Sequence, residues 1–236
     1  MNCELTNLRT GGNILVIIPA YNEEKMIGEV IDGAKKFANR IVVVNDASTD
    51  RTAEIAAEKG AIVLSHLVNL GLGGALRTGL EYARRTNAEF TITFDADGQH
   101  CPEDIPKIIQ PLREKKAEVV LGVRFADIKQ NNVPFHRFVY NTLLAKWATF
   151  LCYGLAVSDS QSGLRAFSQT ALEKISLRSL RMEVSSEFVG EIKRNNLVLV
   201  EVPIQTIYTK YSLSKGQSFF TGIKTFLNII LNRFSE

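Results

Sequence analysis

Residues 13–24 read NILVIIPAYNEE, and they carry the strongest fold signal in this chain of 236 residues. Ile14 to Ile18 form a continuous, largely β-branched apolar run that ends in a polar turn. From Glu23 to Ala38 the apolar residues recur at helical spacing. A continuous apolar run is typical of a strand that is buried on both faces of a parallel sheet. The segment therefore predicts a buried strand, a turn and a covering helix.

The same pattern repeats along the first half of the chain. Further strands are expected at 41–44, 61–64, 90–94 and 118–123. Helices are expected at 52–59, 73–85 and 103–116. Alternating strands and helices favour an α/β fold, with a Rossmann-like, mostly parallel central sheet between two helical layers.

After Arg124 the alternation stops. The sequence predicts helices at 135–151, 169–175 and 183–195, and a strand pair within 197–207 that is broken at Pro203. An amphipathic helix is expected at 219–234. We therefore expect one domain over residues 1–210, followed by a basic loop and a C-terminal amphipathic helix at 211–236.

The composition is that of an ordinary globular protein, with 45% hydrophobic and 22% charged residues. Cys3, Cys101 and Cys152 form no short-spaced pair, which argues against a disulfide scaffold, a redox CxxC and a cysteine zinc site. The N-terminus is too polar for a signal peptide, and the longest apolar run, 147–157, is too short to span a bilayer. These features favour a cytoplasmic location, with contact to the cytoplasmic face of a membrane left open.

The net charge of +3 is unevenly distributed. Residues 124–150 and 205–236 each carry +3, which leaves the remainder at −3. Two basic segments in a nearly neutral chain favour an anionic ligand or a membrane surface. Nucleic acid is not an expected partner, because it usually demands a larger continuous basic patch. Solvated surface lysines are the alternative explanation.

Acidic residues follow three of the expected strands, at the edge where an open parallel sheet binds its ligands. These segments read PAYNEE (19–24), NDASTD (45–50) and DADGQH (95–100). The glycine-rich segment GLGGALRTG (71–79) fits neither the GxGxxG nor the GK[ST] phosphate-binding pattern. A Rossmann dehydrogenase and a P-loop nucleoside triphosphatase are therefore not expected. One interpretation of this segment is a tight loop and a helix start.

Asp95 and Asp97 are the sharpest local chemical signal. Side chains two residues apart on an extended segment project to the same side, and a divalent cation would relieve the repulsion between two carboxylates. Such a hard oxygen site suits Mg²⁺ or Mn²⁺ bound together with a diphosphate. Taken alone, the pair is a weak signal, because acidic residues are common in loops and an ordinary acidic loop is the favoured alternative. His100 can extend the site or be an exposed loop histidine.

Taken together, the motifs carry a family resemblance. PAYNEE, VNDASTD, NLGLGGALRTG, DADGQH, GVRF and DSQSGLRAF occur in this order between residues 18 and 167. The chain resembles inverting family 2 glycosyltransferases of the GT-A fold over roughly residues 13–210, most closely dolichol-phosphate mannose synthases and related polyprenyl-phosphate glycosyltransferases. The resemblance implies a GT-A glycosyltransferase domain that uses Mg²⁺ or Mn²⁺, a nucleotide-sugar donor and a dolichyl or polyprenyl phosphate acceptor.

The resemblance also implies the roles of donor-site residues. Pro19, Tyr21 and Glu23 would line the base and ribose pocket, and Asp46 would hold the base or the ribose. An aromatic face can stack on a base, and a carboxylate accepts hydrogen bonds from ribose hydroxyls. For Tyr21 a packing role is the alternative. The family ligands of the metal and the donor diphosphate correspond to Asp95, Asp97 and Gln99. The basic loop that closes over the donor would include Lys215, where the match is loose.

Acceptor residues follow from the same resemblance. Arg124, Arg137 and Asn141 match positions that hold the acceptor phosphate, and arginine can grip a phosphate through two hydrogen bonds. A surface ion pair is the alternative for these arginines. Asp159 lies in the loop beside the sugar site and is counted with Asp97, Arg124 and Arg137 as a catalytic candidate. If the acceptor were a sugar hydroxyl, Asp159 or Glu187 would have to act as the base.

Mannose from GDP-mannose is the expected donor sugar, with UDP-glucose and UDP-N-acetylglucosamine as alternatives. A non-catalytic nucleotide-sugar-binding protein is the rival class, and a nucleotidylyltransferase is disfavoured because its glycine-rich loop is missing after the first strand. The C-terminal helix could lie on a membrane surface, pack on the sheet or contact another subunit. The oligomeric state stays open.

Overall fold

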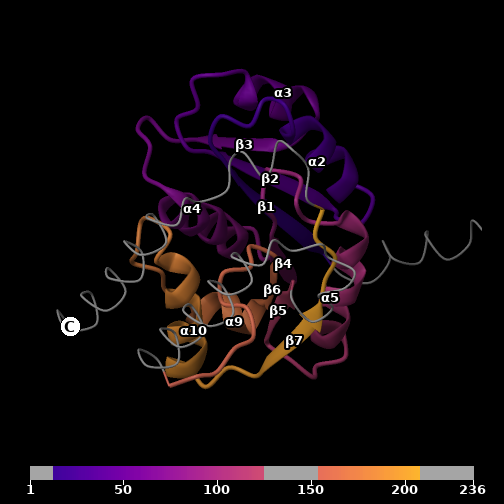
Figure 1. Ribbon diagram of the computed structural model, residues 1–236, viewed down its shortest axis with the longest axis vertical. Coiled ribbons are helices and arrows are strands. Elements are labelled where there is room, and N and C mark those ends of the chain that lie inside the picture. Colours follow the sequence, from indigo (N-terminus) through magenta and orange to yellow (C-terminus); the bar gives the residue numbers. More distant parts are fainter. Residues whose placement is uncertain (1–12, 125–153, 208–236) are drawn as a thin grey trace, which may run out of the picture.

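The computed structural model describes residues 13–124 and 154–207 (Figure 1). Within these ranges, the strands are β1 (Ile14–Ala20), β2 (Arg40–Asn45), β3 (Ile62–Ser65), β4 (Phe90–Thr93), β5 (Val119–Val123), β6 (Arg165–Ser168) and β7 (Leu199–Pro203). The helices are α2 (Ile27–Ala34), α3 (Thr52–Glu58), α4 (Leu72–Arg85), α5 (Ile105–Arg113), α9 (Gln169–Lys174) and α10 (Val184–Arg194), with a short 3-10 helix, η1 (Pro102–Asp104).

The strands form one mixed sheet in the order β3-β2-β1-β4-β6-β5-β7. β1 to β4 are parallel, and β5 pairs with β7 in parallel. β6 runs antiparallel between β4 and β5, so β4 and β5 point the same way. The carboxyl ends of the six parallel strands therefore share one edge of the sheet, together with the start of β6. This edge is called the carboxyl edge below.

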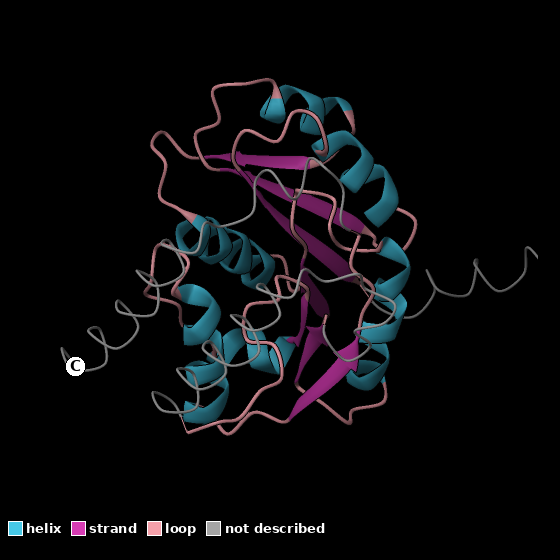
Figure 2. Ribbon diagram, viewed as in Figure 1, coloured by secondary structure: helices cyan, strands magenta, loops and turns pink. Residues whose placement is uncertain are grey.

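Helices cover both faces of the sheet (Figure 2). Along β1, Val16 and Ile18 join the core beneath α2 and α5. Leu15 and Ile17 join the core beneath α4, α9 and α10. Alternate side chains of a strand point to opposite faces, so a strand without polar residues is what a sheet covered on both sides requires. The expected α/β fold is thereby confirmed.

The expected strands and helices before Arg124 are all present, with shifted ends. The first helix begins at Ile27, because residues 23–26 form a turn in which the carbonyl of Glu23 accepts from the Met26 and Ile27 amides. The expected helix 103–116 begins as η1 and continues as α5, which ends at Arg113. The expected helices at 169–175 and 183–195 are α9 and α10.

In the second half, one strand was not predicted and one expectation was wrong. The strand β6 was not foreseen, because four residues reading RAFS with a buried arginine carry little strand signal. The expected strand pair at 197–207 is the single strand β7, and beyond it Thr206 forms only an isolated bridge with His100. The helices expected at 135–151 and 219–234, and the boundary between 210 and 211, lie outside the described residues.

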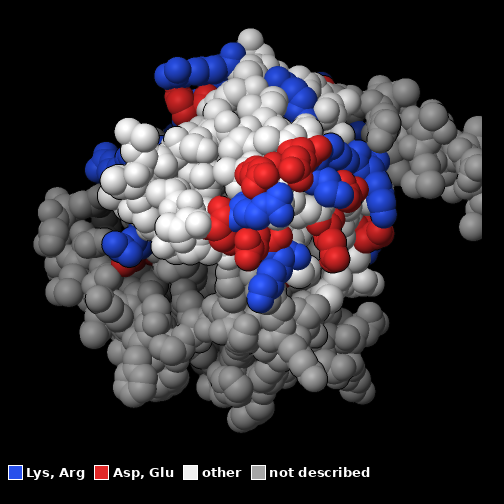
Figure 3. All heavy atoms as spheres, turned by 90° about the horizontal axis from the view of Figure 1, so that it is seen from above, with Lys and Arg blue, Asp and Glu red and all other residues white. Residues whose placement is uncertain are grey.

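Charges of both signs intermingle at the α2 and α3 end of the molecule (Figure 3). Arg51 pairs with Glu54 at 2.8 Å and with Glu58 at 3.8 Å, and Lys59 pairs with Asp32. Exposed pairs of this kind contribute little to stability, because water and salt screen them. This end therefore presents no surface of a single charge sign. Among the described helices, none is long and apolar enough to cross a bilayer.

Candidate active site

The acidic loop 95–100 follows β4 at the carboxyl edge. His100 is buried beneath this loop, and its Nε2 lies 3.0 Å from Asp95 Oδ2. Its ring meets Phe94 edge to face at 5.3 Å between centroids. Asp97 Oδ1 accepts from the backbone amide of Gln99 at 3.0 Å. The interpretation of His100 as an exposed loop histidine is wrong, because its side chain is buried and contacts the Asp95 carboxylate.

The two carboxylates differ in their electrostatics. Burial, followed by repulsion from Asp95, raises the pKa of Asp97 to about 6. Burial by itself would raise the pKa of Asp95 too, but His100, Arg124 and Arg165 outweigh it and hold the pKa below its usual value. Two carboxylates crowded at one place cannot both ionise freely without a cation. Asp95 and Asp97 therefore concentrate negative charge at one place, as the binding site of a divalent cation requires.

Gly163 allows the acidic loop to approach β6. A Cβ atom at residue 163 would overlap both carboxylate oxygens of Asp95. The carbonyl of Gly163 accepts from Thr93 Oγ1 at 2.7 Å, which ties the loop before β6 to the end of β4. Asp95 is thus held between His100 and Gly163, and a larger residue at 163 would displace it.

The segment after β7 lies across the same loop. The Ile207 amide donates to the Gln99 carbonyl at 2.8 Å, and the Gln205 amide donates to Asp104 Oδ2 at 2.7 Å. Asp104 is fully buried. Residues distant in sequence therefore brace the acidic loop from the side of β7.

Arg124 and Asp159 form a two-point ion pair beside the acidic loop. Arg124 Nε donates to Asp159 Oδ2 at 2.7 Å, and Nη2 donates to Oδ1 at 2.8 Å. The backbone amide of Arg124 also donates to Oδ2, at 3.2 Å. Asp159 is buried, and 15% of the Arg124 side chain is exposed. The pair thus fixes the plane of the Arg124 guanidinium where β5 ends.

Arg165 is a second cation near this cluster, and it is buried. Its guanidinium lies 4.6 Å from the ring centroid of Phe188, and its Nη2 donates to the Ser160 carbonyl at 3.2 Å. Burial lowers the pKa of Arg165 to about 10, although Asp95 and Asp159 act to raise it. Arg165 remains charged at neutral pH and balances the charge of Asp95 and of the buried Asp159.

Asp46 anchors the loop between β3 and α4. Its Oδ1 accepts from the Leu70 amide at 2.8 Å, and its Oδ2 accepts from the Gly71 amide at 2.7 Å. His66 Nδ1 lies 2.8 Å from Oδ1, and His66 Nε2 lies 2.9 Å from Thr78 Oγ1. Both oxygens of Asp46 are therefore engaged within the protein. The expected contact of Asp46 with a base or ribose stays a prediction.

Tyr21 and Glu23 follow β1, which ends with Pro19 and Ala20. The Tyr21 side chain is about half exposed, so its ring is accessible at the carboxyl edge. The Glu23 backbone amide donates to Thr52 Oγ1 at 2.8 Å, and Asn22 Oδ1 accepts from the Thr49 amide at 2.8 Å. The loops after β1 and β2 are thus tied together beneath Tyr21.

The predicted site residues within the described ranges gather at the carboxyl edge. The acidic pair, Gln99, Arg124 and Asp159 form one cluster, and Tyr21, Glu23 and Asp46 follow the neighbouring strands. Arg137, Asn141 and Lys215 lie outside the described residues. Sequence reasoning missed the supporting roles of Gly163, Arg165 and His66. For Gly163 and Arg165 the only signal was their place in the motif DSQSGLRAF. For His66 it was the position of a lone histidine after an expected strand.

The donor set fits a divalent cation that is shared with a ligand. Asp95 and Asp97 supply hard oxygens from one short loop, and among the described residues no third acidic, histidine or cysteine side chain completes a protein-only cage. Mg²⁺ keeps open positions of this kind for water or phosphate oxygens. The residues therefore suit a cation that also binds a diphosphate.

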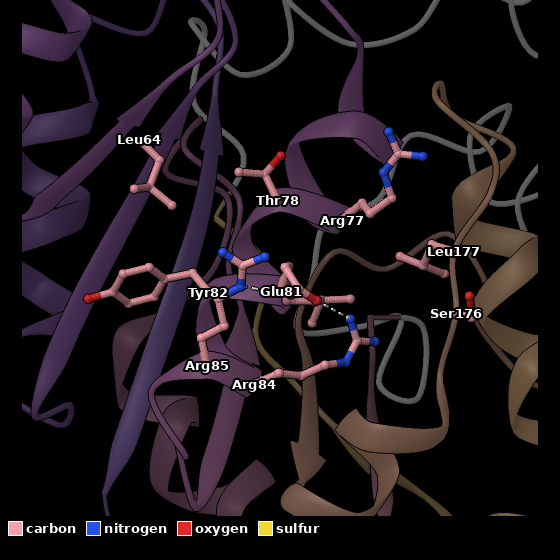
Figure 4. A pocket seen from close by; sticks show the side chains of 10 residues that line it. Leu64, Arg77, Thr78, Glu81, Tyr82, Arg84, Arg85, Ser176 and Leu177 are labelled. Atoms are coloured by element: carbon pink, nitrogen blue, oxygen red, sulfur yellow. Dashed lines mark hydrogen bonds and ion pairs between the residues drawn. The ribbon is translucent and has the colours of Figure 1, made fainter.

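A separate cavity of about 520 Å³ lies on the outer side of α4 (Figure 4). Glu81 pairs there with Arg84 at 3.3 Å and with Arg85 at 2.8 Å. Arg84 Nε also donates to the Leu172 carbonyl at 2.7 Å, which ties α4 to α9. The residues of the acidic cluster do not line this cavity. It is therefore distinct from the site at the carboxyl edge.

A comparison with known protein families shows to which family the chain with this site belongs. The model of glycosyl transferase family 2 matches residues 15–176, which include the acidic pair, Arg124 and Asp159. The chain belongs to glycosyl transferase family 2. The carboxyl-edge cluster of this family 2 glycosyltransferase is thus its candidate active site.

Three known proteins show how this family 2 glycosyltransferase relates to others. It is 41% identical to a UDP-N-acetylglucosamine–dolichyl-phosphate N-acetylglucosaminyltransferase of Methanococcus voltae, over 92% of this chain and 95% of that protein. It is 31% identical to a dolichol-phosphate mannosyltransferase of Pyrococcus furiosus, over 89% of this chain and 59% of that protein. Glucosyl-3-phosphoglycerate synthase of Mycobacterium tuberculosis, solved with Mn²⁺, UDP and its product, superimposes with a TM-score of 0.70 at 21% identity, over 98% and 82% of the chains. This last likeness confirms the GT-A fold.

Proposed function

We propose that this family 2 glycosyltransferase transfers a sugar from a nucleotide sugar to a polyprenyl phosphate, with inversion at the anomeric carbon. The observation that carries the proposal is the juxtaposition of the acidic pair, Asp95 and Asp97, with the ion-paired Arg124 at one sheet edge. The carboxylates suit a cation and a donor diphosphate, and the arginine suits a phosphate monoester. The dolichyl-phosphate relatives of this chain support the acceptor class.

The donor would lie along the ends of β1, β2 and β4. Tyr21 offers a ring on which a base can stack, and Glu23 and Asp46 are the candidates for contacts to base and ribose. Asp95 and Asp97, with Gln99 beside them, would hold Mg²⁺ or Mn²⁺. When bound, the cation neutralises charge on the diphosphate that leaves. His100 and Gly163 keep Asp95 in place for this task.

The acceptor needs no catalytic base. A phosphate monoester has a second pKa near ~6 and is largely dianionic at neutral pH. One of its oxygens would form the bond to the anomeric carbon while the bond from that carbon to the nucleoside diphosphate breaks. Arg124 would orient the attacking phosphate, with Arg137 and Asn141 as further candidates from the family resemblance. Asp159 would act by holding the Arg124 guanidinium.

N-acetylglucosamine from UDP-N-acetylglucosamine is the first donor to test. The relative that is named for this donor is 41% identical to this chain, and the match covers 95% of that relative. The mannosyltransferase is 31% identical, and the match covers 59% of it. GDP-mannose, the donor expected from the family resemblance, stays a prediction and is the second donor of the panel.

The deciding experiment follows labelled sugar from UDP-N-acetylglucosamine, GDP-mannose and UDP-glucose into an organic-extractable polyprenyl phosphate product. Purified protein is assayed with Mn²⁺ or Mg²⁺ and with an EDTA control. We expect metal-dependent label in the lipid phase from one donor. Donor hydrolysis without labelled lipid would refute the acceptor class and leave sugar-hydroxyl acceptors as the next to test. Donor binding without any turnover would instead favour the non-catalytic class.

A further inference from the structure

One short segment contacts both halves of the candidate active site. It runs from Asp159 to Arg165 and is called the bridging segment below. At its start, the Asp159 carboxylate holds the Arg124 guanidinium at 2.7 and 2.8 Å. Further along, Gly163 lies so close to the Asp95 carboxylate that a Cβ atom has no room there. The bridging segment therefore sets the position of Arg124 relative to Asp95.

The register of the sheet places the end of the bridging segment between the two strands that lead to these groups. β6 lies between β4 and β5 (Figure 1). Its first residue, Arg165, pairs with Thr93 of β4 on one side and with Leu121 of β5 on the other. The Leu164 carbonyl also accepts from the Gly122 amide at 2.9 Å. The backbone of the bridging segment is thus fixed at this end.

The Arg165 side chain ties the earlier part of the bridging segment to α10. It is buried, and its Nη2 donates to the Ser160 carbonyl at 3.2 Å. Its guanidinium lies over the Phe188 ring of α10, at 4.6 Å from the ring centroid. Phe188 is itself buried and stacks on Phe167 of β6 at 5.4 Å between centroids. A planar guanidinium can donate a hydrogen bond and lie on a ring at once, so Arg165 links a loop carbonyl to a helix.

The charge of Arg165 acts on a carboxylate in each half of the site. Burial lowers the pKa of Arg165, while Asp95 and Asp159 act in the opposite direction. Water and salt screen such interactions only weakly when the charges are buried. In the proposed reaction Asp95 belongs to the metal and donor half, and Asp159 orients the arginine of the acceptor half. One buried cation is therefore shared by the two halves.

We propose that Arg165 is a positioning residue for both halves of the active site. It holds the bridging segment so that Gly163 borders Asp95 while Asp159 faces Arg124. Because its side chain is buried, Arg165 acts through these residues and not by contact with substrate. The inference rests on the proposed function for the roles of the two halves. It predicts that a single substitution at Arg165 weakens metal binding and acceptor binding together.

The first test measures Mn²⁺ binding by the full chain from the electron paramagnetic resonance signal of free Mn²⁺, without donor or acceptor. Arg165→Met keeps a long side chain but removes the charge and the hydrogen bond. We expect it to weaken Mn²⁺ binding by about tenfold or more, as loss of a residue that supports a metal ligand commonly does. A role in charge balance alone predicts the opposite, because removal of a nearby cation would strengthen Mn²⁺ binding. Equal or tighter binding would therefore overturn the proposal.

A conservative variant and a matched control accompany this test. Arg165→Lys keeps the charge and can donate to the Ser160 carbonyl, so it should recover part of the lost affinity. A lysine variant as weak as Arg165→Met would contradict this role of the charge and the hydrogen bond. Arg84→Met is the control, because Arg84 also donates to backbone carbonyls, those of Leu172 and Ile175, but lies on α4 away from the acidic cluster. It should bind Mn²⁺ as the wild type does, and an equal loss would attribute the effect to general destabilisation.

A second pair of variants tests the same tie with all charges in place. Phe188→Leu removes the ring face beneath the guanidinium, so Mn²⁺ binding should weaken, although less than in Arg165→Met. Phe167→Leu is the control, because it removes the ring that stacks on Phe188 and leaves the ring under Arg165. It should bind Mn²⁺ as the wild type does. Thermal unfolding identifies the folded variants, and this pair decides the question if Arg165→Met does not fold. Equal Mn²⁺ affinities in the two phenylalanine variants would overturn the proposal.

The last measurement addresses the acceptor half. With saturating Mn²⁺ and donor, the KM for a water-soluble short isoprenyl phosphate should rise severalfold in Arg165→Met. An unchanged acceptor KM beside weakened Mn²⁺ binding would confine Arg165 to the metal half and refute the shared role. Failure of the wild type to transfer sugar would instead refute the proposed acceptor, while the Mn²⁺ measurements would still test the link between Arg165 and Asp95. Absence of Mn²⁺ binding by the wild type would refute the metal site and this proposal together.

Discussion

At the scale of single residues, the candidate active site depends on the residues that surround its carboxylates. His100 fixes Asp95 at 3.0 Å, and Gly163 leaves the space that Asp95 occupies. Arg165 balances the charge of Asp95 and Asp159 without contacting solvent. The position of the acidic pair is therefore set by neighbours that no two-residue motif describes.

Gly163→Ala should damage both stability and transfer. The added methyl group overlaps the Asp95 carboxylate, which must move, and overpacking of this kind costs about 1–3 kcal/mol. We expect at least about a tenfold loss of kcat/KM with a weaker response to added metal. Thermal unfolding and initial rates at varied Mn²⁺ measure the two effects. Gly28→Ala is the control, because a Cβ there meets only ordinary contacts at 3.4 Å. A fully active Gly163→Ala variant would refute the packing argument.

Cys101 should be an unreactive thiol. Burial, followed by its hydrogen bond to Glu103, raises the pKa of Cys101 to about 11. A raised pKa keeps the thiol protonated and non-nucleophilic up to that pH, since the thiolate is the reactive form. In a Cys3→Ser, Cys152→Ser background, the alkylation rate by iodoacetamide should be low at pH 8 and rise until about pH 11. A plateau near the ordinary cysteine pKa would contradict the prediction, and unfolded protein serves as the reference.

At the scale of elements, carboxylates hold the backbone of two loops and of one strand end. Asp46 holds the loop before α4, Glu187 holds the loop before α10, and Asp159 holds the residue after β5. In each case a buried or half-buried carboxylate accepts backbone amides that no helix or strand uses. Such bonds to a charged acceptor are among the stronger ones in proteins, so these loops are braced parts of the fold.

Asp46→Asn should loosen the loop before α4. Asparagine offers one neutral acceptor oxygen in place of two charged ones, so one of the Leu70 and Gly71 amides loses its acceptor and the other keeps only a neutral one. We expect a loss of about 1–3 kcal/mol in the free energy of unfolding. The donor KM should rise more than kcat falls. Asp32→Asn, which removes only an exposed pair with Lys59, should change stability by less than about 0.5 kcal/mol. Equal effects of the two variants in denaturant titrations would show that Asp46 does not brace the loop.

At the scale of the whole molecule, one edge of the sheet collects the charged residues that the proposed reaction needs. Helices cover the two faces of the sheet, and the loops that follow the six parallel strands emerge at the carboxyl edge.

Metal binding should stabilise the folded molecule through Asp97. A ligand that binds only the native state at about 100 times its Kd adds about 2.7 kcal/mol of stability. Mn²⁺ with a nucleoside diphosphate should therefore raise Tm by several degrees in the wild type. Asp97→Asn should keep a cooperative transition, lose this shift and lose metal-dependent transfer. Asp32→Asn is the matched control and should keep the shift and the transfer. The same metal-dependent shift in Asp97→Asn and wild type would reject the assignment of Asp97 as a ligand.

The residue pattern alone was enough to predict the α/β class and the order of elements up to Arg124, because burial on both faces of a sheet requires continuous apolar strands and helices with a period of 3.6 residues. It also located the acidic pair, since residues after parallel strands meet at one edge. Three features appear only in the folded chain: β6 inserts between β4 and β5, Asp159 pairs with Arg124, and Asp46 accepts amides of the loop before α4. These contacts join residues from 24 (Asp46 and Leu70) to 78 (Phe90 and Ser168) positions apart, and a local periodic pattern cannot predict such pairings.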